Sequence, residues 1–396
     1  MYQLTKEQLL RDLHKAYLRA KEGKSSKSYV IEFEKYLEKN LVELCEALWN
    51  GTYEPLPAYC FAIKDPTSRE ILASQFRDCV VNHLYFLYTH QMYERTMIYD
   101  TYSSIKGRGT SLGVKRAQHH MRSVTLNYTR DGFVLQKDIR GFFIHINRKL
   151  TCKIACASLD KMAAHKIHKG KPETWQDVVD IPFVKYLTKV ICSHDPAKNC
   201  IIIGSLEELE KVPVNKSQRK AAKDHGFGLG NLNSQILAGV LLNVLDQYVK
   251  RVLKCKHYQR STDDMCFMER TLKRIRKINR KVTVFLRNVL DLETNEGKTR
   301  IRGFRQGFKF VGSFIKPYRT YVCSQTLRRI RQKLDSKIHS DLSIERKRSS
   351  VNSFLGMLKH VKSFRIRIKL VLPYIMDGSL IGTFNDDYTI FYPAAL

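Results

Sequence analysis

The chain has 396 residues, enough for two or three domains, and 43% of them are hydrophobic, which is sufficient for a buried core. Its 69 Lys and Arg against 38 Asp and Glu give a formal net charge of +31, which favours a polyanionic partner. Nucleic acid is preferred over a membrane surface, because no apolar run approaches the roughly 20 residues of a membrane-spanning helix.

The ten cysteines and 13 histidines are dispersed along the chain and show no zinc-ligand spacing. The nearest cysteine pair, Cys152 and Cys156, has no second pair to complete such a site. The first residues lack the apolar core of a signal peptide. We therefore expect reduced, mostly buried thiols in a cytoplasmic protein.

Residues 1–50 are expected to form two helices. Thr5 followed by Gln8 fits a capping box at the start of the first helix. Gly23 to Ser26 break the pattern. A second helix then carries a row of apolar residues on one face: Phe33, Tyr36, Leu37, Leu41, Leu44 and Leu48.

A short β-hairpin is predicted next, with strands at 60–63 and 69–72 around a turn at 65–68. Lys64 and Arg69 would lie close together on this hairpin. Two neighbouring cations suit a triphosphate, whose charge must be neutralised. An ordinary exposed hairpin is the alternative interpretation.

A helix is predicted at 76–97, and a glycine-rich basic segment at 103–110 then precedes a further helix. This segment contains Lys106 and Arg108. Backbone amides and cations at a helix start can bind a phosphate backbone. The spacing of a Walker P-loop is absent.

Three aspartates are candidate metal ligands. The apolar strand 133–136 leads into Asp138, and Asp263 and Asp264 stand where a β-hairpin would turn. Each signal alone is weak, because such residues are commonly caps, turns or solvated surface groups. Carboxylates supply the oxygen ligands that hard cations require. Asp264 is the weaker candidate, since neighbouring strand residues point to opposite faces.

A glycine-rich turn at 226–235 opens a long apolar helix at 236–249. Because glycines let the backbone approach a ligand closely, this turn is a candidate site for a nucleotide or template base. The segment before it is interpreted as an insertion in a continuing domain, with helices at 150–164 and 174–193, a strand at 199–204 and a basic loop at 211–223.

The remaining chain is predicted to contain a basic amphipathic helix at 269–290 and a strand pair within 308–315. From about residue 323 the chain is expected to be helical. The basic stretch 327–334 would contact a duplex backbone. Further pieces are expected at 349–361 and 366–372.

The order of these elements resembles a reverse transcriptase from Lys64 to about Arg367. The nucleotide-loop block most resembles that of enzymes from bacterial diversity-generating retroelements, because it has Leu229-Gly230 and ends in Ser234-Gln235 rather than Ser-Pro. The blocks that carry the resemblance are FAIKDPTSREI, SSIKGRGTSLGVKRA, FVLQKDIRGFFIHI, GLGNLNSQ, RSTDDM, GKTRI, FKFVGSFIKP and VNSFLGMLKHVKSF.

This resemblance implies an α+β fold with right-hand polymerase architecture. Residues 1–50 would be an N-terminal helical extension and 51–130 the fingers. Residues 131–322 would form the palm, an antiparallel sheet with helices and inserted finger elements, and 323–396 a helical thumb. The implied activity is RNA-directed DNA synthesis by two-metal nucleotidyl transfer, with two Mg²⁺ ions or Mn²⁺ in their place.

The resemblance also implies the site residues. Asp138, Asp263 and Asp264 would be the catalytic metal ligands, Phe143 a gate against a ribose 2′-hydroxyl, and Lys298 a group near the leaving phosphate. The implied dNTP-binding residues are Lys64, Arg69, Ile139, Phe143, Leu229, Gly230 and Lys298. The implied nucleic-acid-binding residues are Lys106, Arg108, Ser261, Arg328, Arg329 and Arg331.

Two residues depart from the family pattern. Ser261 stands where the family usually has Tyr, which would alter activity or primer use. Leu229 replaces a Gln that would hydrogen-bond substrate, so we expect low base discrimination.

The expected partners are an RNA template, a DNA product or primer, and dNTPs in a bacterial cytoplasm, with no membrane. A small basic accessory protein or a structured noncoding RNA would be a further partner. Two alternatives stay open: a phage-defence reverse transcriptase that copies a dedicated noncoding RNA, and a catalytically inactive nucleic-acid-binding protein.

Overall fold

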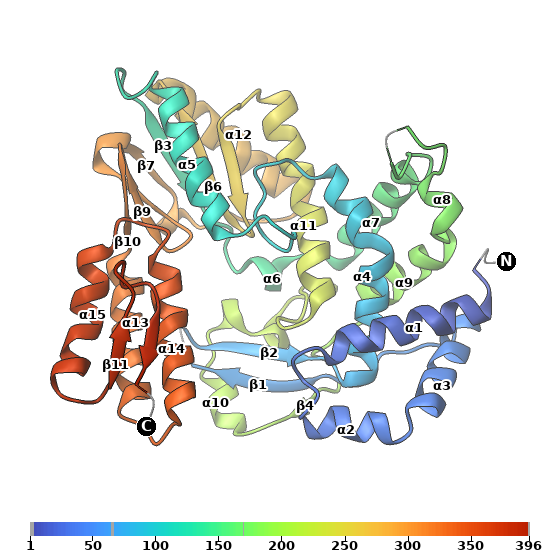
Figure 1. Cartoon of the computed structure of the whole chain (residues 1–396). Coiled ribbons are helices and arrows are strands. Elements are labelled where there is room, and N and C mark those ends of the chain that lie inside the picture. Colours follow the sequence, from blue (N-terminus) through green and yellow to red (C-terminus); the bar gives the residue numbers. More distant parts are fainter. Residues whose placement is uncertain (1–3, 65–66, 169, 395–396) are drawn as a thin grey trace. The chain divides into compact units, whose positions relative to one another are not determined.

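The computed structural model describes residues 4–64, 67–168 and 170–394. The expected α+β class is confirmed, because helices predominate and the sheets are small and mainly antiparallel (Figure 1). The chain forms two compact units. Unit 1 contains residues 1–105, 138–256 and 278–298, and unit 2 contains residues 106–137, 257–277 and 299–396. The division into extension, fingers, palm and thumb stays a prediction.

Unit 1 begins with three helices, α1 (Lys6–Lys21), α2 (Ser28–Lys35) and α3 (Leu37–Trp49). The expected cap is present, since Thr5 Oγ1 accepts a hydrogen bond from Gln8 N at 3.2 Å. The prediction of one continuous second helix is wrong, because two helices, α2 and α3, stand in its place. Tyr36 leaves the helical conformation, with φ −127° and ψ 41°, and its side chain is 62% exposed rather than part of a buried face.

The predicted hairpin is confirmed as β1 (Tyr59–Ile63) and β2 (Arg69–Ala73), paired antiparallel from Tyr59 opposite Ala73 to Ile63 opposite Arg69. Residues 65–66 of the predicted turn lie outside the described residues. The predicted strand near residue 200 is β4 (Ile201–Ile202), which pairs parallel with β1. The hairpin is therefore one part of a three-stranded sheet rather than an isolated arm.

In unit 1, α4 (Phe76–Thr96) and α7 (Arg148–Ala163) pack against α11 (Leu232–Gln247), whose apolar residues Leu237, Leu241 and Leu245 are fully buried. The helix expected at 174–193 is interrupted, because Asp180 accepts a hydrogen bond from Phe183 N at 2.8 Å and starts a new helix. Unit 1 also contains α6 (Phe142–His145), α8 (Trp175–Val178), α9 (Ile181–Ser193) and α10 (Leu206–Glu210).

Unit 2 contains a four-stranded antiparallel sheet in the order β5-β6-β3-β7. Its strands are β3 (Phe133–Lys137), β5 (Tyr258–Ser261), β6 (Asp264–Glu269) and β7 (Arg300–Gly303). The two central strands, β6 and β3, bury consecutive residues, which explains their continuous apolar runs. Helix α5 (Thr110–Val124) packs against this sheet. Helix α12 (Leu272–Leu290) follows β6, and its residues belong to unit 2 up to Lys277 and to unit 1 from Ile278.

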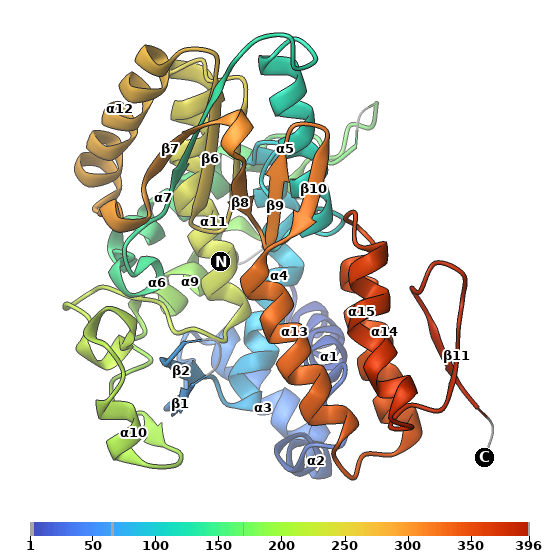
Figure 2. The ribbon, with the colours of Figure 1, turned by 90° about the vertical axis from the view of Figure 1, so that its left-hand side faces the viewer.

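A second sheet of unit 2 has the order β10-β9-β8 and precedes three helices (Figure 2). In addition to the expected helices, the C-terminal part contains a hairpin that the sequence did not predict. Its Phe391 is fully buried in the cluster formed by the helices. The elements are β8 (Phe308–Phe310), β9 (Ser313–Lys316), β10 (Arg319–Val322), α13 (Ser324–Ile338), α14 (Ile344–Leu358), α15 (Phe364–Met376), β11 (Gly382–Phe384) and β12 (Phe391–Pro393).

All ten cysteines are free thiols. Within the described ranges, no helix combines the length and the apolar character that a membrane crossing requires.

Candidate functional site

The Asp-Asp pair lies on a β-hairpin in unit 2, as the sequence predicted. Ser261 of β5 pairs with Asp264 of β6, and Thr262 and Asp263 form the turn between them. Thr262 has φ +53°, an unfavourable conformation for a β-branched residue. Arg260, only 1% exposed, donates a hydrogen bond from Nη1 to Thr262 O at 2.9 Å. This buried arginine, which sequence reasoning missed, therefore contributes to holding the turn.

Asp138 directly follows β3, again as predicted. Lys137 of β3 pairs with Met265 of β6. Asp138 follows Lys137 in the chain, and Asp264 precedes Met265. In an antiparallel ladder, these two positions belong to the same end of the strand pair. The strand register, which depends only on local backbone pairing, therefore brings the Asp138 and Asp264 positions to one sheet edge.

The carboxylate of Asp138 is nearly buried, with 7% of its side chain exposed, and Oδ2 lies 2.8 Å from Lys298 Nζ. Asn295 Nδ2 donates to the same oxygen at 3.3 Å, and Asn295 N donates to the backbone oxygen of Asp138 at 2.8 Å. The structure thus brings together Asp138 and Lys298, two of the predicted site residues. It adds Asn295, which sequence reasoning missed.

Asp138, Asp263 and Asp264 offer only oxygen donors, which fits a hard divalent cation. The side chain of Asp138 already holds one positive charge, the ammonium of Lys298. Among the described residues, no group of three or more His, Cys, Asp and Glu side chains is arranged to hold a metal ion. A metal site formed by the three aspartates therefore stays a prediction.

The glycine-rich loop with Leu229 and Gly230 contacts strand β2. Leu72 N donates to Leu229 O at 3.2 Å. A Cβ at Gly228 would lie 3.1 Å from Leu72 Cβ, so a larger residue would separate the loop from the strand. Gly230 has φ +114°, which L side chains rarely adopt. Two elements predicted to bind dNTP, the loop and the hairpin with Arg69, are therefore adjacent in unit 1.

The same loop is joined to the segment with Phe143. Phe227 N donates to Phe143 O at 2.8 Å, and Gly226 N donates to Ile146 O at 2.7 Å. The side chain of Phe143 is half-buried and lies edge-on to Phe142, with ring centroids 5.3 Å apart. The predicted gate residue and the predicted nucleotide loop are thus parts of one hydrogen-bonded assembly.

Arg148 connects this assembly to α7. It is 4% exposed, and its Nη1 donates to His225 O at 2.9 Å and to Gly226 O at 3.3 Å. Its Nη2 donates to Asp195 Oδ2 at 3.3 Å, and its backbone N donates to Asp224 O at 2.9 Å. No local sequence pattern marks Arg148, because its carbonyl partners lie 77 and 78 positions away.

The other predicted dNTP-binding residues have different surroundings. Lys64 Nζ lies 2.7 Å from Glu208 Oε1, and this hydrogen bond raises the pKa of the exposed lysine. Arg69 Nη2 donates to Thr67 Oγ1 at 3.3 Å. Ile139 is 1% exposed, so its backbone rather than its side chain would have to meet a nucleotide.

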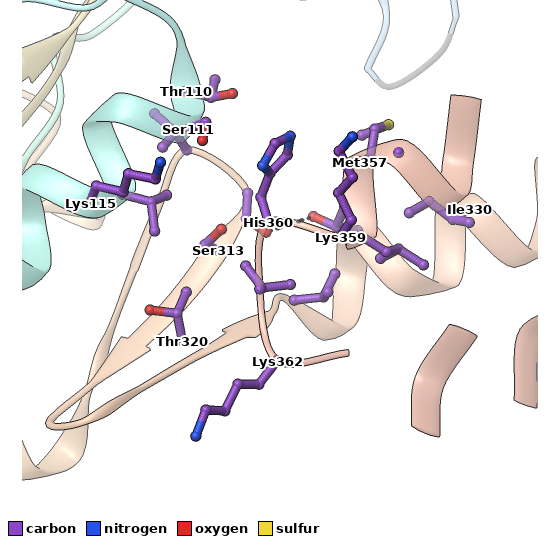
Figure 3. Close-up of a pocket in the computed structure, with 18 of the residues that line it drawn as sticks. Thr110, Ser111, Lys115, Ser313, Thr320, Ile330, Met357, Lys359, His360 and Lys362 are labelled. Atoms are coloured by element: carbon purple, nitrogen blue, oxygen red, sulfur yellow. Dashed lines mark hydrogen bonds between the residues drawn. The ribbon is translucent and has the colours of Figure 1, made fainter. Parts of the chain in front are cut away.

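Of the residues predicted to contact nucleic acid, Lys106, Arg328 and Arg331 are exposed, whereas Arg108, Ser261 and Arg329 are half-buried. None of them lines the large cavity of unit 2, whose volume is about 770 Å³. Figure 3 shows that Lys115 of α5 and the loop residues Lys359, His360 and Lys362 line this cavity together with hydroxyl groups. These basic residues come from segments about 245 residues apart, Lys115 to His360.

No known protein family matches the chain, and no curated protein matches it. Among solved structures, apo telomerase from Candida tropicalis is similar with a TM-score of 0.49 and 11% identity, over 82% of this chain and 59% of that chain. Telomerase from Candida albicans in complex with a TWJ fragment of telomeric RNA has a TM-score of 0.47 and 10% identity, over 88% and 61%. The chain thus spans about three fifths of the length of these proteins. Because both TM-scores are below 0.5, we base the functional proposal on this chain's own residues.

Proposed function

We propose that this chain is an RNA-directed DNA polymerase. The observation that carries the proposal is the register of β3 and β6, in which Lys137 faces Met265. It brings the positions of two candidate carboxylates to one sheet edge, beside the turn with Asp263. In the reaction, the 3′-hydroxyl of a primer attacks the α-phosphate of a dNTP, a phosphodiester bond forms, and pyrophosphate leaves.

Asp138, Asp263 and Asp264 are the residues that would hold two Mg²⁺ ions, or Mn²⁺ in their place. Bound divalent ions would make the 3′-hydroxyl more acidic and neutralise charge on the triphosphate. Asn295 and Lys298 orient the carboxylate of Asp138 through the contacts at 3.3 and 2.8 Å. Because Lys298 is 66% exposed, its ammonium can also move toward a leaving phosphate.

Substrate selection belongs to unit 1 in this proposal. Lys64 and Arg69 neutralise the triphosphate from the β1–β2 hairpin, and Lys64 must exchange its ion pair with Glu208 to do so. Phe143 excludes a ribose 2′-hydroxyl. Leu229 replaces a hydrogen-bonding side chain in the loop beside β2, so discrimination between bases is low.

The template and the growing strand contact cations of unit 2, including Lys106, Arg108 and the basic residues of α13. The cavity with Lys115, Lys359 and Lys362 adds positive charge next to hydroxyl donors. Cations and hydroxyls of this kind position a phosphate backbone without reading its sequence.

The biological setting favoured by Leu229-Gly230 and Ser234-Gln235 is a diversity-generating retroelement in a bacterial cytoplasm, with a small basic accessory protein. Ser261, in place of the usual Tyr, favours the second candidate, a defence enzyme that copies a structured noncoding RNA. A neighbouring repeat pair and a gene for a small basic protein would support the first setting. An isolated defence locus would support the second.

The test is dNTP incorporation on an RNA template by wild type, Asp263→Ala and Asp341→Ala. Asp341 is an exposed aspartate of the same unit outside the proposed site, so it is the matched control. We expect incorporation by wild type and Asp341→Ala and its loss in Asp263→Ala. Equal incorporation by wild type and Asp263→Ala would refute the polymerase. No incorporation by any of them, with RNA binding retained, would instead support an inactive nucleic-acid-binding protein.

A further inference from the structure

Helix α12 carries a row of basic side chains that none of the proposed polymerase roles uses. Six of its cations are exposed: Lys273, Arg276, Lys277, Arg280, Lys281 and Arg287. At about 100° per residue they lie within roughly 140° of the helix circumference. At about 1.5 Å per residue the row is roughly 21 Å long. Because α12 is one continuous helix, helix geometry alone determines this arrangement.

The opposite face of α12 is fully used in the protein core. Ile275, Ile278, Val282, Leu286 and Leu290 are each 0–1% exposed. The helix contains no Asp or Glu. Arg274, beside the row, lies 3.9 Å from Glu269, but none of the six exposed cations forms an ion pair with another described residue. The row is therefore a concentrated positive charge that the rest of the described chain does not neutralise.

We infer that the exposed face of α12 binds the phosphate backbone of an RNA segment. A straight row of uncompensated cations gains affinity by releasing counterions from a polyanion. It would bind RNA by charge and shape rather than by sequence, since no aromatic side chain interleaves with the row. The choice of RNA over DNA rests on the proposed function, whereas the binding of a polyanion rests on the helix itself.

An anionic membrane is the competing partner for a basic helix. Membrane-surface helices insert an apolar face into the lipid while their cations contact headgroups. The apolar face of α12 is already buried, and only Val284 and Val289, 57% and 45% exposed, are large apolar side chains open to solvent on this helix. This favours RNA.

The test compares two triple variants of the full chain. The stripe variant, Lys273→Gln/Lys277→Gln/Lys281→Gln, removes three lysines of the row. The control, Lys153→Gln/Lys161→Gln/Lys223→Gln, removes three exposed lysines elsewhere. Binding of a 30-base-pair RNA duplex without primer or dNTP is measured by fluorescence anisotropy between 50 and 200 mM salt. We expect the stripe variant to bind roughly 10-fold more weakly and its log–log salt slope to fall by about 2. The control should bind like wild type.

Wild-type affinity and salt slope in the stripe variant would overturn the inference. Equal loss in both triple variants would overturn it too, because net charge and not the row would then be responsible. Loss of binding to phosphatidylserine vesicles with retained RNA binding would assign the helix to a membrane instead.

Primer extension on a short primer–template separates this inference from the polymerase. The stripe variant should retain wild-type incorporation at saturating substrate, because its three lysines have no proposed role there. If Asp263→Ala incorporates dNTP like wild type, the proposed polymerase function is refuted, while the RNA-binding result for α12 stands. Thermal melting checks that both triple variants fold.

Discussion

Lys298 Nζ and Asp138 Oδ2 lie 2.8 Å apart, although 66% of the lysine side chain is exposed and only 7% of the aspartate side chain. The lysine thus reaches from solvent to a nearly buried carboxylate. Any other cation that binds this oxygen must compete with the ammonium. Metal affinity at this carboxylate can therefore be measured without turnover.

Lys298→Gln is expected to bind Mn²⁺ about 5-fold more tightly than wild type. The ammonium of Lys298 competes with a metal for the Asp138 carboxylate, and its removal favours metal binding by roughly 1 kcal/mol. Calorimetric titration of Mn²⁺ into the two proteins measures this. Lys309→Gln removes an exposed lysine outside the site and is the control. Unchanged Mn²⁺ affinity in Lys298→Gln would contradict a metal role for Asp138.

Arg148→Met should lower the free energy of unfolding by about 2–4 kcal/mol, because the carbonyl oxygens of His225 and Gly226 and the carboxylate of Asp195 each lose a hydrogen bond from a buried guanidinium. Urea denaturation measures the change. Lys149→Met, next in the chain, removes a lysine that is 80% exposed and should cost less than about 1 kcal/mol.

Arg148→Lys gives a second measurement, since it keeps the charge but not the forked geometry. If Arg148 positions the nucleotide loop, this variant should show a raised KM for dNTP with kcat nearly unchanged. A fall in kcat alone would indicate that the loop is not held by Arg148 for substrate binding.

Leu229→Gln is expected to reduce misincorporation, because a side-chain amide can hydrogen-bond the substrate and a leucine cannot. Primer extension on an RNA template, followed by sequencing of the product, compares the two error rates. Wild-type misincorporation no higher than that of Leu229→Gln would remove the link between Leu229 and low fidelity.

Tyr374 Oη donates a hydrogen bond to Asp335 Oδ1 at 3.2 Å, between α15 and α13. Burial of the phenol is the larger cause and the hydrogen bond to Asp335 the next, and together they raise the pKa of Tyr374 to about 12. Because the folded chain favours the neutral phenol, its contribution to stability is complete below about pH 10, the ordinary pKa, and is lost as the pH rises through 12. An ultraviolet difference titration of wild type against Tyr374→Phe measures the pKa. Titration of Tyr374 near pH 10 would show that this contact between the helices is absent.

Most local elements could be predicted because their signals are local. The Asp263-Asp264 pair and its flanking residues predicted a hairpin, and Thr5 predicted a helix start. Predictions failed where the tertiary context outweighs periodicity. Tyr36 interrupts a row of apolar residues that reads as one helix, and Asp180 starts a new helix within another. The hairpin β11–β12 is stabilised by burial of Phe391 among helices, which its own short strands do not reveal.

The sequence alone determined which residue types the site could contain: three aspartates after or between short strands, cations on a hairpin, and glycines before an apolar helix. It also determined the cationic face of α12, because helix periodicity is a property of neighbouring residues. Only the tertiary structure decided that Lys298 meets Asp138, that Arg148 holds the loop before Leu229, and that Lys115 shares a cavity with His360. The physical reason is that each of these contacts joins segments from about 77 to about 245 residues apart, and burial and hydrogen bonding between such segments depend on the packing of the whole unit.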